Sequence, residues 1–361
     1  MIDTGLDGSH PWLEDNFAGF LDFREDSPEF ITDPKDSEDV KSHGTHVAGT
    51  VGSSNDEIGV ATGVNLLGLN VFDTNWLGSL ENVGMIDAIQ WIQENNEEDY
   101  NGKNINIDVV NFSLGDGTGA NTEVPEGFGS FISDFLEEEG ITVVSAAAND
   151  YAKYQREGVG WPAIDSTLNV GSVWKENEGE QTIEGAKDTS TEADQISGFS
   201  QRFHNGSDST STTLFAPGGT INSTVPTNWL PFSSPTDEKV GTSMAAPHVS
   251  GVVALMQDVA RDFGDTTLPP KKIAQILHET ADKVIDDDRG SVESGFFGDP
   301  LDVTGKEFPR INAYNAVERV RKETDETFDL GGTTRFAGIN YSGTFEGATP
   351  TSALDGLTTE T

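Results

Sequence analysis

Residues 241–249 read Gly-Thr-Ser-Met-Ala-Ala-Pro-His-Val, and they are the most informative run in the sequence. A glycine-led turn precedes Ser243, and Pro247 fits the first turn of a helix. A serine at a helix start is most often an N-cap, which is the ordinary interpretation of Ser243 taken alone. The dense run of small residues around it is unusual for a simple cap. It makes Ser243 a candidate nucleophile.

Residues 42–50, Ser-His-Gly-Thr-His-Val-Ala-Gly-Thr, form a second motif. Small residues between two histidines predict a helix start that packs closely against a neighbour. Zinc-binding histidines on a helix are spaced i, i+4 with a glutamate between them. Here the spacing is i, i+3 with Gly and Thr between, which argues against a metal pair. His43 is therefore the candidate for chemistry, and His46 is expected to be structural.

A third motif, Ile-Asp-Thr-Gly, occupies residues 2–5. An acidic residue directly after apolar strand residues lies at the carboxyl end of a strand, where parallel α/β sheets place their chemistry. The alternative is that Asp3 only caps a turn. The motif alone does not decide between the two.

The rest of the chain alternates strand and helix patterns. Buried strands are predicted at Ile107–Phe112, Ile141–Ser145 and Leu168–Val173. Helical faces are predicted for two sets of apolar residues: Met85, Ile89 and Ile92, and Ile273, Ile276, Leu277, Ala281 and Val284. This alternation predicts an α/β fold with a mostly parallel sheet covered by helices on both faces. The polar stretch 174–197 is predicted to be a surface insertion or long hairpin.

Composition narrows the classes of function. The 361 residues include 62 acidic and 21 basic side chains, a net charge of −41, and no cysteine. Acidic residues are spread over the whole length between apolar runs, so we interpret the charge as a salt-adapted surface. Nucleic acid and anionic membranes are poor partners for such a surface. No apolar run reaches the length of a membrane span, and no signal peptide is visible.

The three motifs together resemble the subtilisin-like serine peptidases, whose catalytic residues follow the order Asp, His, Ser. The resemblance extends from Met1 to about Arg321. It implies a three-layer subtilisin-like fold and a peptidase domain at 1–321. Residues 322–361 are rich in Gly, Thr and Ser and are expected to be a linker or the start of a C-terminal extension.

The resemblance implies a role for each motif residue. Ser243 is the nucleophile, His43 the general base and acid, and Asp3 the carboxylate that orients the imidazole. Asn149, in the run Ser-Ala-Ala-Ala-Asn-Asp at 145–150, supplies an oxyanion donor. Family members commonly have Gly before this Asn, whereas this chain has Ala148. No cofactor is required for such catalysis.

Substrate-binding residues follow from the same resemblance. Two edges, one at 113–115 and one at 78–79, would pair with the substrate backbone. The pocket for the residue before the cleaved bond would lie between residues 113–115 and 146–148, with Gly160 as its floor. The implied residues are Ser113, Leu114, Gly115, Ala146, Ala147, Ala148, Gly160, Gly78 and Ser79. A glycine floor predicts a preference for bulky apolar residues before the cleaved bond. The Trp161–Pro162 bond is a candidate cis peptide.

Besides Ala148, the match departs from the family in two places. Structural calcium is expected in the family, and Asp56 is a candidate ligand, but Trp12 replaces the carboxylate expected after His10-Pro11. Only two residues precede Asp3, whereas a strand usually has about five. We therefore expect an N-terminal truncation that leaves this chain poorly folded or inactive. The full-length parent is expected to be secreted, monomeric and made with a propeptide.

Three hypotheses remain from the sequence. The leading one is a salt-adapted serine endopeptidase that acts on polypeptides outside the cell. The second is a catalytically silent fragment or pseudo-peptidase that serves as a binding or structural module. The third, an esterase on an α/β-hydrolase fold, is disfavoured because no Gly-X-Ser-X-Gly elbow surrounds Ser243 and the triad order differs.

Overall fold

The computed structural model describes residues 1–24, 28–74, 80–97, 99–100, 103–115, 119, 136–206, 211–227, 234–287, 290–293 and 298–324. Within these residues one large sheet carries the fold, in the order β16-β18-β13-β10-β9-β8-β1-β3-β2. Its strands are β1 (Ile2–Asp3), β2 (Phe17–Asp22), β3 (Leu66–Asn70), β8 (Val109–Phe112), β9 (Thr142–Ala146), β10 (Leu168–Val173), β13 (Leu214–Pro217), β16 (Asp282–Ile285) and β18 (Glu307–Arg310). All neighbouring strands are parallel except β16 and β18.

Helices cover both faces of this sheet, as the α/β prediction requires. Their bounds are α1 (His43–Gly52), α2 (Met85–Asn95), α4 (Tyr151–Tyr154), α5 (Thr242–Gly264), α6 (Pro270–Thr280) and α7 (Ala313–Thr324), with short 3-10 helices at Glu14–Asn16, Pro34–Asp36 and Ala163–Asp165. On β9, Val144 packs with α5, α6 and α7, while Val143 packs with α2. Adjacent strand residues point to opposite faces, so these helices form separate layers.

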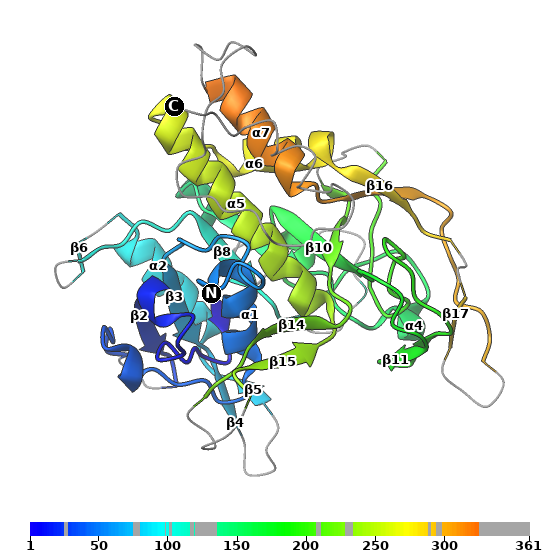
Figure 1. Ribbon diagram of the computed structural model, residues 1–361, viewed down its shortest axis with the longest axis horizontal. Coiled ribbons are helices and arrows are strands. Elements are labelled where there is room, and N and C mark those ends of the chain that lie inside the picture. The colour runs from blue at the N-terminus through cyan, green and yellow to red at the C-terminus, as the bar shows by residue number, and fades with distance from the viewer. Residues whose placement is uncertain are drawn as a thin grey trace, which may run out of the picture.

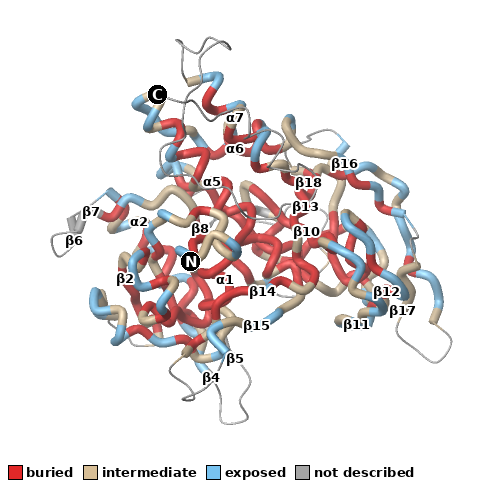
Figure 2. Tube along the Cα trace, in the orientation of Figure 1, coloured by how far each residue is buried: buried red, intermediate tan, exposed pale blue. Residues whose placement is uncertain are grey.

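Helix α5 is the central helix of the fold. It crosses the middle of the sheet, with α6 and α7 beside its C-terminal half (Figure 1). Its first nineteen residues are almost all buried, as is each residue of β10. Small residues permit this depth: a Cβ added at Gly251 would lie 2.6 Å from Val60 Cβ. Figure 2 shows the buried residues concentrated in this region.

Smaller strands form the periphery. They are β4 (Phe72–Thr74) with β5 (Leu80–Asn82), β6 (Asp99–Tyr100) with β7 (Lys103–Asn104), β14 (Ile221–Thr224) with β15 (Thr236–Lys239), and a sheet of β11 (Gln181–Ile183), β12 (Ala186–Asp188) and β17 (Ser291–Glu293). The polar stretch 174–197 thus contains the predicted hairpin, β11–β12. It is not wholly a surface insertion, because Trp174 is fully buried and donates through Nε1 to Asp188 at 2.9 Å.

The strands predicted at 107–112, 141–145 and 168–173 correspond to β8, β9 and β10. One helix prediction was too long: α6 ends at Thr280, and Val284 lies in β16 instead of on the helical face. Val284 keeps its apolar role because it packs on Phe308 in the core. At the C-terminus, α7 runs to Thr324, and the rest of the predicted linker lies outside the described residues.

The short strand β1 pairs on both sides, with β3 and with β8. Beside Met1, residues of these two strands line a cavity of about 760 Å³. The expectation that the short strand weakens the fold stays a prediction. Among the described residues, no helix has the length and apolar character of a membrane span.

Candidate active site

Asp3 lies at the carboxyl end of β1, between two strands. Ile2 pairs in parallel with Leu69 of β3 and with Phe112 of β8, and Asp3 pairs with Asn70. Only 2% of Asp3 is exposed. Parallel strands end at one edge of the sheet, so this pairing holds the carboxylate where α/β folds place their reacting groups.

His43 is the first residue of α1 and faces Asp3. Its Nδ1 lies 2.7 Å from Asp3 Oδ1, and the backbone N–H of Thr4 donates to the same oxygen at 2.7 Å. Because an ionised carboxylate only accepts, Nδ1 carries the proton and Nε2 is the basic nitrogen on the other side of the ring. Burial lowers the pKa of His43, but the charge of Asp3 and its hydrogen bond outweigh burial and raise the pKa above its ordinary value.

Two glycines let α1 approach the end of β1 this closely. A Cβ added at Gly44 would lie 2.0 Å from the carbonyl oxygen of Gly5, well inside van der Waals contact. Gly5 itself has φ +119°, a backbone conformation that favours glycine. Gly44 of the second motif and Gly5 of the third therefore determine how closely His43 approaches Asp3.

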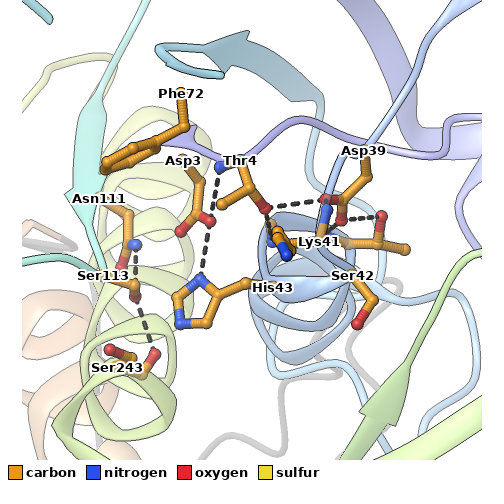
Figure 3. Close-up of polar contacts among 12 residues, drawn as sticks. Asp3, Thr4, Asp39, Lys41, Ser42, His43, Phe72, Asn111, Ser113 and Ser243 are labelled. Carbon is orange, nitrogen blue, oxygen red and sulfur yellow. Dashed lines mark hydrogen bonds and ion pairs between the residues drawn. The ribbon is translucent and has the colours of Figure 1, made fainter. Parts of the chain in front are cut away.

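Ser243 lies in the first turn of α5, after Gly241 with φ +150°. Figure 3 shows Ser243 on the side of the His43 ring away from Asp3. The three residues of the candidate triad thus come from the carboxyl end of β1 and the N-terminal ends of α1 and α5. These two helices pack against one another.

A buried polar chain fixes the first turn of α5 to β8. Ser250 donates to Asn111 Oδ1 at 2.8 Å. Asn111 Nδ2 donates to Ser113 Oγ, and Ser113 Oγ donates to the carbonyl of Ser243, each at 2.8 Å (Figure 3). Each group in the chain is satisfied, so it rigidifies the turn that carries the nucleophile. The side chain of Ser113 is therefore occupied, and only its backbone is left for a peptide substrate.

Asn149 follows β9 and lies against the same turn. Its Oδ1 accepts from the backbone N–H and from Oγ1 of Thr242, both at 2.9 Å. A backbone N–H needs an acceptor, so these contacts determine which end of the amide is oxygen. Nδ2 then points toward the Gly241 turn, since a Cβ added at Gly241 would lie 3.4 Å from it. Asn149 thus presents a donor beside Ser243.

Ala148, the departure from the family pattern, has φ +81°. An alanine in the left-handed region costs roughly 1–2 kcal/mol. The conformation is held by its neighbours: the N–H of Ala148 donates to Thr242 Oγ1 at 3.2 Å, and its carbonyl accepts from Gln201 at 2.9 Å. The strained backbone conformation therefore lies directly before Asn149.

The segments of the predicted first-position pocket converge. A Cβ added at Gly115 would lie 3.5 Å from Ala148 Cβ and from the carbonyl oxygen of Trp161. Gly160 donates to the carbonyl of Ala147 at 2.9 Å, and the Trp161–Pro162 bond is cis.

Not every side chain of that prediction faces the pocket. Ala146 and Ala147 are buried in core clusters, and Leu114 packs on another core cluster. Only the backbone of the two alanines remains for substrate contact. Gly78 and Ser79 lie outside the described residues.

His46 is buried and bonds to backbone carbonyls, as expected for a structural histidine. Its Nε2 donates to the carbonyls of Ile221 at 2.9 Å and Asp237 at 3.1 Å, and burial lowers its pKa to about 3. Around Asp56, the described residues contain no group of three histidine or acidic side chains that could hold a metal ion. The Trp12 carbonyl nearby already accepts from Ser54 at 2.8 Å. Asp56 as a calcium ligand stays a prediction.

Several residues of this site were missed from the sequence. Thr4, Asp39 and Thr242 each bond to groups beside the candidate triad. Thr4 and Thr242 stand inside the quoted motifs, so motif position could have indicated them. Asp39 stands four residues before His43, and its role depends on a tertiary contact that no local pattern encodes.

Comparison with known proteins agrees with this geometry. The profile of the Subtilase family matches residues 1–299. Subtilisin E of Bacillus subtilis (strain 168) is 32% identical over 71% of this chain and 54% of its own length. An extracellular serine proteinase of Thermus sp. (strain Rt41A) is 32% identical over 71% of this chain and 49% of its own.

The fold is also similar to that of a solved structure. Fervidolysin from Fervidobacterium pennivorans, described as a keratinolytic enzyme related to subtilisin, superposes with a TM-score of 0.58 at 25% identity, covering 88% of this chain and 41% of fervidolysin. This chain spans about half the length of Subtilisin E. The family match, the relatives and the shared fold lead to one conclusion: the chain belongs to the subtilase family.

Proposed function

We propose that this protein is a serine endopeptidase in which Asp3, His43 and Ser243 form the catalytic triad. The observation that carries the proposal is the 2.7 Å hydrogen bond between His43 Nδ1 and Asp3 Oδ1, with Ser243 on the opposite side of the His43 ring (Figure 3). Family membership and the named relatives support the reaction class.

The proposed reaction proceeds in two halves. Ser243 Oγ attacks the scissile carbonyl while His43 Nε2 takes its proton, and Asp3 stabilises the imidazolium. The oxyanion accepts from Asn149 Nδ2 and from the backbone N–H of Ser243. His43 then protonates the leaving amine, which departs and leaves an acyl group on Ser243. Water, deprotonated by His43, hydrolyses that ester and restores the serine.

Labelling with a fluorophosphonate tests this proposal. We expect the probe to add to Ser243 Oγ, because only a serine activated by its base reacts readily. Mass spectrometry of the digested protein would locate the adduct, with Ser243→Ala as the unlabelled control. A folded protein that takes up no probe would instead favour the silent binding or structural module.

The same measurement tests salt adaptation, which we propose from the net charge of −41. Self-repulsion of this magnitude opposes folding until cations screen it. Labelling should therefore be faster in molar salt than in dilute buffer. We further propose secretion, a monomeric state and structural calcium, with Asp56 as a candidate ligand. The name of the Thermus relative supports an extracellular setting.

For specificity, we propose a preference for bulky apolar residues before the cleaved bond, with Gly160 as the floor of the pocket. Peptides that vary only this residue should give kcat/KM values at least about 10-fold higher for Phe or Leu than for Ala. Gly160→Val should fill the pocket and reverse the order. A wild-type preference for Ala or Gly would contradict the proposal.

A further inference from the structure

Asp39 is a buried carboxylate close to the candidate triad that the proposed mechanism does not use. Only 2% of it is exposed. Its Oδ1 accepts from Thr4 Oγ1 at 2.8 Å and from the N–H of Lys41 at 3.0 Å. Its Oδ2 accepts from the N–H and from Oγ1 of Thr45, both at 2.7 Å (Figure 3). Burial raises the pKa of Asp39, and the four donors oppose that shift by bonding to the charged form.

The partners of Asp39 belong to the two elements that carry the Asp–His pair. Thr4 follows Asp3, and its N–H donates to the Asp3 carboxylate. The hydroxyl of Thr4 also accepts from the N–H of Gly44 at 3.0 Å, directly after His43. Thr45 lies two residues beyond His43. A continuous chain of bonds therefore runs from Asp3 through Thr4 and Asp39 to the first turn of α1.

This chain replaces the usual cap of α1. Ser42, the N-cap residue, has φ +60° and makes no side-chain capping bond. The N–H groups of Gly44 and Thr45, which a cap would satisfy, are bonded instead by Thr4 Oγ1 and Asp39 Oδ2. A negative charge at a helix N-terminus is also favourable. Asp39 thus fixes where α1 begins, and His43 is its first residue.

The backbone around Asp39 is held equally closely. Gly5 and Asp39 form an antiparallel bridge, and the N–H of Val40 donates to the carbonyl of Thr4 at 3.0 Å. A Cβ added at Gly5 would lie 2.0 Å from the carbonyl oxygen of Glu38. Neither side of this contact has room to shift, so a change at Asp39 is transmitted to the turn that carries His43.

We propose that Asp39 is a positioning residue for the reaction: it holds the first turn of α1 against the end of β1 and thereby fixes the His43 imidazole on Asp3. It touches neither substrate nor imidazole. The inference rests on the proposed peptidase function.

Asp39→Asn is the sharpest variant. Each carboxylate oxygen faces one backbone N–H, that of Lys41 or that of Thr45. An amide has one acceptor oxygen, so in either orientation its NH2 meets a backbone donor that cannot rotate away. We expect kcat for peptide cleavage to fall on the order of 10-fold with KM little changed, because misplaced catalytic groups slow the chemical step.

The pH profile separates positioning from stability. Asp3 and Asp39 raise the pKa of His43, and Lys239 lowers it. Activity needs the neutral imidazole, so it declines as the pH falls through the pKa of His43. Without the charge of Asp39 that pKa is lower, and the acid limb of the kcat/KM profile should shift to lower pH. Thr4→Val removes no charge, so a shift of its acid limb to lower pH would report a loosened Asp3–His43 contact, whereas an unshifted limb would report only the lost charge in Asp39→Asn.

Asp188→Asn is the matched control. Asp188 is also a 2%-exposed carboxylate, and it accepts from Trp174 Nε1 and the N–H of Gly198 outside the Asp3–His43 chain. We expect it to lower the unfolding midpoint while leaving kcat and the acid limb unchanged. If Asp39→Asn does not fold, Thr4→Val and Thr4→Ser are the variants to compare. Thr4→Ser keeps the hydroxyl and should retain activity, whereas Thr4→Val lacks the hydroxyl and should lose activity.

The outcomes are distinct. An inactive wild-type protein would overturn the proposed function and, with it, this inference. Wild-type cleavage together with a folded Asp39→Asn variant of unchanged kcat and acid limb would overturn the inference alone, as would equal activity of the two Thr4 variants.

Discussion

Ser243→Ala is expected to lower the turnover number for peptide hydrolysis about a million-fold, the loss measured for the serine of subtilisin, a relative of this chain. The variant has no hydroxyl to attack the carbonyl and cannot form the acyl-enzyme. About 10³- to 10⁴-fold acceleration over water should remain, supplied by substrate binding and the oxyanion donors. Kinetics on a chromogenic peptide at equal concentrations of folded protein would measure the loss.

His43→Ala should lower the turnover number by about the same factor as Ser243→Ala. The double variant should lose no more turnover than either single variant. Serine and base act as a unit, so their effects are not additive. Ser54→Ala, an exposed serine on the loop after α1, is the control and should leave turnover unchanged. If the two losses multiplied, Ser243 and His43 would act independently and the proposed triad would be wrong.

The fold was largely predictable because it depends on local patterns. Buried strands such as β9 and β10 are short segments of valine and small residues, and they lie where the sequence predicts them. Val284 was misassigned because a helical period can continue by coincidence past the true end of a helix. Trp174 was placed at the surface because the residues after it are polar. It is instead buried against Tyr151 and Phe199, and Asp188 accepts from its Nε1.

The candidate site was also only partly predictable. Residues within motifs could be named from the sequence, since small residues around Asp3, His43 and Ser243 recur in the family. The groups that support these residues could not be named from the sequence. Asp39 acts through Thr4 and Thr45, and Asn111 through Ser113 and Ser250, which lie far apart in the chain. Such contacts are set by how β1, β8, α1 and α5 pack, and no spacing rule anticipates them.

Asn149→Ala is expected to lower kcat about 10²- to 10³-fold with little change in KM, a magnitude measured for the equivalent asparagine of subtilisin. The amide donor acts on charge that develops only in the transition state, so ground-state binding is unaffected. Yet Oδ1 of Asn149 also bonds the N–H and hydroxyl of Thr242, and alanine removes both functions at once. Alanine alone cannot separate catalysis from support of the turn.

Asn149→Asp separates them. One carboxylate oxygen keeps both bonds to Thr242, while the other replaces the Nδ2 donor with a negative acceptor facing the oxyanion. If Asn149 stabilises the oxyanion, the aspartate variant should stay folded and lose at least as much kcat as the alanine variant, because like charges repel. If Asn149 only supports the turn, the aspartate should be tolerated and the alanine should lower the unfolding midpoint. Kinetics and thermal unfolding on both variants therefore decide the role of Asn149, whichever way the alanine result falls.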